Sequence, residues 1–95
     1  MSEKMVEITL SGECTIYEVA EWQNKIIDKW SDLSQSLNLN MADVSDVDAS
    51  FVQLLLSCKK TAHANDAQCH LINPPSTLQE RLKNMHLEEI LSDDN

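Results

Sequence analysis

Apolar and polar residues alternate in three short stretches of the chain. The apolar positions of these stretches are Val6, Ile8 and Leu10; Leu37, Leu39 and Met41; and Cys69 and Leu71. A period of two residues is typical of a strand with one buried face. We therefore predict three strands, with a turn at residues 11–13 (SGE) after the first and a stop at residues 73–75 (NPP) after the third.

Three other stretches have the period of a helix. The predicted helical faces are Val19, Trp22, Ile26 and Trp30; Phe51, Leu54, Leu55, Cys58 and Ala62; and Leu78, Leu82 and Met85. Thr15 and Glu18 have the spacing of a capping box, so the first helix is expected to start there and to run to about Trp30. Thr77 and Glu80 have the same spacing before the third helix, and Ser76 is the alternative cap.

The order of elements, strand and helix in alternation, predicts an α/β fold with a partly parallel sheet and right-handed crossovers. Asn38 and Asn40 give the second strand a polar face, unlike the continuous apolar strands of a sheet covered on both sides. Helices are therefore expected mainly on one face. Leu87, Ile90 and Leu91 predict a closing apolar turn, and residues 1–95 are expected to form a single domain.

The charge, the hydropathy and the cysteine content of the chain disfavour several classes of protein. Sixteen acids against seven bases give a net charge of −9, which disfavours nucleic-acid binding and favours a basic patch on a partner protein, although solubility alone also accounts for it. No apolar run reaches the length of a membrane span and no secretory signal is evident, so a cytoplasmic protein without membrane insertion is expected. Three widely spaced cysteines predict buried thiols rather than disulfides.

The segment from Asp46 to Ser50 joins the second strand to the second helix, where functional loops of α/β folds are found. Asp48 is placed to cap the helix. Ser50 lacks the G-x-S-x-G context of a nucleophile, and a single glycine excludes a phosphate loop. The histidines His63, His70 and His86 are isolated, so neither a metal site nor a cofactor is expected, and an enzyme is disfavoured.

The segment LNLNMADVSDVDASFVQLLLSCKK (residues 37–60) resembles the signature of the STAS domain, the sulphate transporter and anti-sigma factor antagonist family. In that family a strand ending in Asp-Leu-Ser leads to Asp-[Ser/Thr]-[Ser/Ala]-Gly and then to an apolar helix. GECTIYEVAEW (residues 12–22) and LINPPSTLQERLKNMHLEEIL (residues 71–91) resemble its second strand with first helix and its last strand with closing helix. The resemblance implies a mixed sheet of about four strands.

The resemblance also implies a regulatory module that docks a partner protein. The implied docking residues are Asp46, Asp48, Ala49, Ser50, Phe51 and Gln53. In the family, phosphorylation of the hydroxyl residue after the Asp releases the partner, but Ala49 stands at that position and cannot accept phosphate. Ser50 remains as a possible phosphorylation site. Phe51 replaces the usual glycine, and we expect it to pack in the core or, as the alternative, to anchor a partner.

Several partners fit this interpretation. The first hypothesis is a bacterial signalling protein that contacts a kinase, an anti-sigma factor or a chemotaxis component. The second is an accessory subunit that binds the ATPase of a lipid-transport ABC system. The third, ranked well behind, is an enzyme or a small-ligand carrier that uses Ser50 or Cys58. The sequence names neither the partner nor the oligomeric state.

Overall fold

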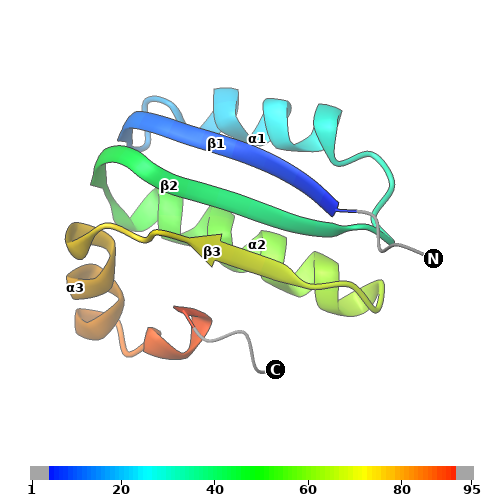
Figure 1. Ribbon diagram of the computed structural model, residues 1–95. Coiled ribbons are helices and arrows are strands. Elements are labelled where there is room, and N and C mark those ends of the chain that lie inside the picture. Colours follow the sequence, from blue (N-terminus) through cyan, green and yellow to red (C-terminus); the bar gives the residue numbers. More distant parts are fainter. Residues whose placement is uncertain (1–4, 92–95) are drawn as a thin grey trace.

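The computed structural model describes residues 5–91 (Figure 1). Its elements follow the alternating order expected for an α/β fold. They are β1 (Met5–Cys14), α1 (Val19–Lys29), β2 (Ser36–Val47), α2 (Ala49–Ala64), β3 (Cys69–Ile72), α3 (Ser76–Asn84) and a final 3-10 helix, η1 (Glu88–Leu91).

The sheet has the strand order β1-β2-β3, and both pairings are parallel. In register, Ile8 lies opposite Leu39, and Leu39 lies opposite Leu71. The α/β class is therefore confirmed. The expected mixed sheet of about four strands is corrected to three parallel strands within residues 5–91. The chain returns to the same end of the sheet through a helix each time, and this makes neighbouring strands parallel.

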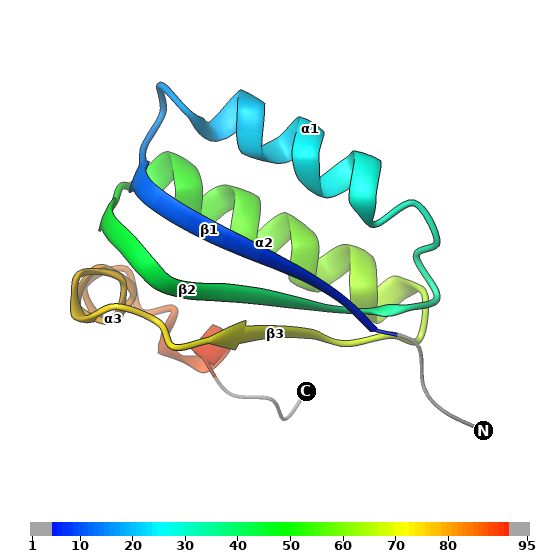
Figure 2. The same ribbon diagram turned by 45° about the horizontal axis from the view of Figure 1, so that its top comes forward.

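The helices α1 and α2 lie side by side on the same face of the sheet, and α3 lies beside the carboxyl end of β2 (Figure 2). The core fills the space between the sheet and these helices. Leu37, Leu39 and Met41 of β2 point into it, whereas Asn38 and Asn40 remain half-buried on the opposite face. The expectation that helices cover mainly one face is confirmed. None of the helices within residues 5–91 combines the length and apolarity needed to cross a membrane.

The first strand is longer than the sequence pattern indicated. Residues 11–13, expected as a turn, continue β1, and the chain turns only after Cys14. Gly12 adopts a φ of 72°, in a stretch where the register with β2 shifts twice. A glycine with positive φ allows such an irregularity within a strand, and this accounts for the misassignment.

The two helix starts predicted from capping boxes differ from the structure. The segment 15–18 forms a turn before α1, and the helix itself begins at Val19. The Glu18 carboxylate does reach back to the Thr15 backbone N–H, at 3.1 Å, but the Thr15 hydroxyl donates to that carboxylate instead of capping the helix. At α3 the N-cap is Pro75, with no side-chain cap from Ser76 or Thr77.

The apolar faces of the helices agree with the helical periodicity. All five residues of the predicted α2 face are buried. Ile26 of α1 and Trp30, which follows the helix, are buried, while Val19 and Trp22 of α1 are partly buried and pack against the core. Leu78 and Leu82 of α3 are buried, and Ile90 of η1 closes the core as the expected final apolar turn.

Candidate functional site

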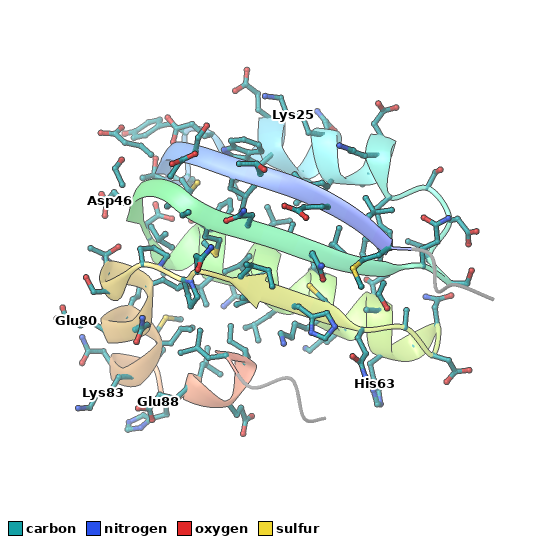
Figure 3. All side chains as sticks on the ribbon, in the orientation of Figure 1. Lys25, Asp46, His63, Glu80, Lys83 and Glu88 are labelled. Carbon is teal, nitrogen blue, oxygen red and sulfur yellow. The ribbon has the colours of Figure 1, made fainter. Side chains whose placement is uncertain are left out.

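The carboxyl ends of the strands meet at one edge of the sheet, where the loop after β1 and the start of α2 lie side by side (Figures 1 and 2). Figure 3 shows Asp46 at this end of the molecule. The Asp48 backbone N–H donates to the Cys14 carbonyl at 3.3 Å, which joins the two segments directly. We call residues 13–18 and 46–53 together the carboxyl-end corner.

The side chain of Asp48 links the two segments of the corner. Its Oδ1 accepts from the Phe51 backbone N–H at 3.0 Å, and its Oδ2 accepts from the Ile16 backbone N–H at 2.8 Å. The first bond caps α2, as expected from the sequence, and satisfies one of the N–H groups that a helix start leaves unpaired. The second bond fixes the loop after β1 against the start of α2.

The residues proposed from the sequence as docking residues divide into three groups. Asp46, Ala49 and Gln53 are exposed, while Asp48 and Ser50 are half-buried. Phe51 is fully buried. Of its two considered roles, packing in the core is therefore the one found, and its side chain offers no surface to a partner.

Two exposed apolar residues in the corner were missed by the sequence analysis. Ile16 is 60% exposed and Tyr17 is 89% exposed, in the turn before α1. Both residues lie outside the apolar stripe of α1, and this position indicates exposed side chains. The expected helix start at Thr15 instead placed both residues in a first helical turn, so their exposure was not predicted.

Carboxylates lie beside this apolar pair. Glu13 of β1 is in register with Asp46 of β2, and both are exposed. Like charges on paired positions of neighbouring strands repel each other. The Arg81 side chain reaches the same end of the sheet, where its Nε donates to the Val47 carbonyl at 2.8 Å. A hollow of about 260 Å³ beside this contact is lined by the acids Asp46 and Glu80 and by the base Arg81.

The structure does not bring the candidate nucleophile Ser50 together with His63 as a base. Ser50 and His63 are thirteen residues apart on α2, a separation of about 20 Å at 1.5 Å per residue. Figure 3 shows His63 at the opposite end of the molecule from Asp46. Within residues 5–91, no group of three His, Cys, Asp or Glu side chains is arranged to hold a metal ion.

The cysteines lie in the core rather than in the corner surface. All three are free and buried. Burial raises the pKa of the Cys58 thiol to about 12, with a contribution from Cys69, and burial raises the pKa of Cys69 to about 11. Burial likewise raises the pKa of Cys14 to about 11, and Glu18 adds to this shift. Thiols with raised pKa values are poor nucleophiles at neutral pH.

A larger hollow, of about 460 Å³, lies away from the corner between α1 and α2. Its lining is mainly apolar and includes Ile26, Ile27 and Leu54. The Trp30 indole N–H, also in this lining, donates to the Gln35 carbonyl at 2.8 Å. We favour the smaller, polar corner as the functional site, because the hollow between the helices offers few polar groups to orient a ligand.

A family model for the STAS domain matches residues 2–94, and the chain therefore belongs to the STAS domain family. The fold is similar to the structure of the anti-sigma factor antagonist SpoIIAA in its unphosphorylated form. That match has a TM-score of 0.75 and 23% sequence identity, and it covers 99% of this chain and 83% of that chain. No match was found among curated proteins.

The phosphorylated form of SpoIIAA, a Bacillus cell fate determinant, is also similar in structure. That match has a TM-score of 0.71 and 23% identity, and it covers 99% of this chain and 86% of that one. At this level of identity the similarity establishes the fold. The family resemblance inferred from residues 37–60 is confirmed by the family model, and the structural similarity supports the same fold.

Proposed function

We propose that this protein is a regulatory binding module of a bacterial signalling pathway, of the anti-sigma factor antagonist type, and that it docks a partner protein through residues 46–53. The main support for this proposal is the structure of the start of α2. Asp48 caps the helix, so that Ala49 and Gln53 are presented on an ordered, exposed surface. An ordered surface loses little conformational entropy on binding.

The proposed module lacks the family's phosphorylation switch at its usual position. Ala49 is exposed at the first position of α2, where a hydroxyl would be reachable by a kinase, but its methyl group cannot be phosphorylated. Ser50, the next residue, is half-buried and is less accessible than Ala49. The partner is therefore bound constitutively, or it is released by a signal other than phosphorylation of residue 49.

The capture of a partner from the native host tests the function. The tagged protein is incubated with a lysate of that host, and captured proteins are identified by mass spectrometry and quantified against a Ser50→Asp variant. The expected partner is a kinase, an anti-sigma factor or a chemotaxis component. Added negative charge at the start of α2 should reduce its capture at least tenfold, because it meets the partner at a desolvated contact next to Asp48.

The control is Ser57→Asp, which places the same charge on an exposed position of α2 two turns further along the helix. It should leave capture unchanged. Recovery of an ABC ATPase in place of a signalling protein would contradict the proposed pathway and favour the role of an accessory subunit. Equal capture by wild type and Ser50→Asp would show that residues 46–53 are not the interface.

A further inference from the structure

We infer that Ile16 and Tyr17 are the apolar anchor of the docking surface, and that they insert into an apolar pocket with a basic rim on the partner protein. This inference rests on the proposed function and deepens it. It extends the interface from the start of α2 to the loop after β1, a segment that the sequence analysis did not include among the docking residues.

Ile16 and Tyr17 are exposed large apolar side chains that lie next to each other in the chain, whereas Met5 and Ile27 are exposed singly. Tyr17 is 89% exposed and Ile16 is 60% exposed, whereas every apolar residue of the neighbouring segment from Phe51 to Leu55 is buried. Contiguous exposed apolar side chains are typical of interaction surfaces, whereas apolar residues exposed singly are common on any protein. Tyrosine is also among the residues that contribute most binding energy at protein interfaces.

The loop that carries the pair is held by several hydrogen bonds. The Ile16 N–H donates to Asp48 at 2.8 Å, and the Thr15 N–H and hydroxyl both donate to the Glu18 carboxylate, at 3.1 and 2.7 Å. The Tyr17 N–H lies 3.4 Å from the Thr15 hydroxyl oxygen. The backbone is therefore ordered before a partner arrives, which reduces the entropy lost on binding.

The charge beside the pair indicates the chemistry of the partner. Glu13 and Asp46 are exposed and in register on neighbouring strands, and Glu18 lies in the same turn as Tyr17. Arg81 lines the hollow beside Asp46, but residues 13–18 and 46–53 themselves carry four acids and no Lys or Arg, so a further cation that approaches Glu13 and Asp46 relieves their repulsion. A partner with Lys or Arg around an apolar pocket thus complements the corner, and this complementarity raises the rate of association.

The inference is tested with the partner purified after its capture by the wild-type protein. Dissociation constants are measured by calorimetry for wild type, Tyr17→Ala and Ile16→Ala, with Ile27→Ala as the matched control. Ile27 is also 60% exposed, but it lies on α1 away from the corner. Loss of an anchor residue is expected to weaken binding about 30-fold for Tyr17→Ala. Circular dichroism confirms that each variant is folded.

The charge requirement is tested with Glu13→Gln/Asp46→Asn in rising salt. Wild-type affinity should fall as salt rises from 50 to 500 mM, and the double variant should show a smaller fall. If Ser50→Asp weakens binding but Tyr17→Ala and Ile16→Ala match Ile27→Ala, the anchor is wrong while the proposed function stands. If wild type captures no partner, the proposed function fails and this inference fails with it.

Discussion

At the scale of single residues, Asp48 determines the geometry of the corner. One carboxylate accepts from Phe51 within its own helix start and from Ile16 in a loop that is 32 residues away along the chain. The first bond is local to the helix start, whereas the second forms only when the loop after β1 lies against α2. The same side chain therefore stabilises the fold and orders the surface that we propose as the docking site.

Replacing Asp48 with Ala should lower the free energy of unfolding by about 1–2 kcal/mol, because the helix loses its cap and the Ile16 N–H loses its acceptor. The measurement is urea unfolding followed by circular dichroism. Asp43→Ala is the control, since Asp43 is exposed on β2 and carries the same charge; its effect should remain within about 0.5 kcal/mol. Equal effects of the two substitutions would contradict the structural role of Asp48.

The two bonds of Asp48 differ in how far they can be predicted. The cap is local, because an Asp directly before an apolar helical stripe is a well-characterised start signal. The bond to Ile16 depends on the tertiary arrangement of β1 and β2, and no spacing in the sequence encodes it. For the same reason the exposure of Ile16 and Tyr17 became visible only in the folded chain.

At the scale of elements, α2 was the most predictable part and β1 the least. Residues of the α2 stripe face the core at every predicted position because helical periodicity fixes their side chains to one face. In β1 the pattern around Gly12 predicts a turn, yet the positive φ of this glycine is accommodated within the strand. A glycine signals unusual backbone conformation, but the sequence does not distinguish a turn from an irregular strand.

The packing of α2 over β3 leads to a prediction about pH. The pKa of Cys58 rises from 9.0 in the unfolded chain to about 12 in the folded one. Above pH 9 the unfolded chain releases this proton while the folded chain keeps it, so the free energy of unfolding falls as pH rises toward 12. The slope for one thiol is at most about 1.4 kcal/mol per pH unit.

Urea unfolding of wild type and Cys58→Ala, at pH 8 and pH 10 in the presence of a reductant, measures this effect. The wild-type protein should lose roughly 1 kcal/mol more than the variant between the two pH values. Groups that titrate in this range and do not interact with Cys58 affect both proteins equally and cancel in the difference. Identical pH dependence in the two proteins would mean that the Cys58 thiol is not desolvated in the folded state.

At the scale of the whole molecule, the two ends of the sheet differ in the residues that they carry. The order of strands and helices brings the loop after β1 and the start of α2 to the same end, where exposed acids and an exposed apolar pair lie together. His63 lies at the other end (Figure 3). The α/β class, three strands and the helices on one face followed from the periodicities, whereas the parallel direction of all three strands required the structure.

The central claim is that the partner covers the carboxyl-end corner, and hydrogen–deuterium exchange of the protein with and without its captured partner tests this most directly. The account predicts slower exchange in the complex at residues 13–18 and 46–53, with no change in the residues that line the hollow between α1 and α2. Protection centred on that hollow, with residues 13–18 and 46–53 exchanging as in the free protein, would contradict the account.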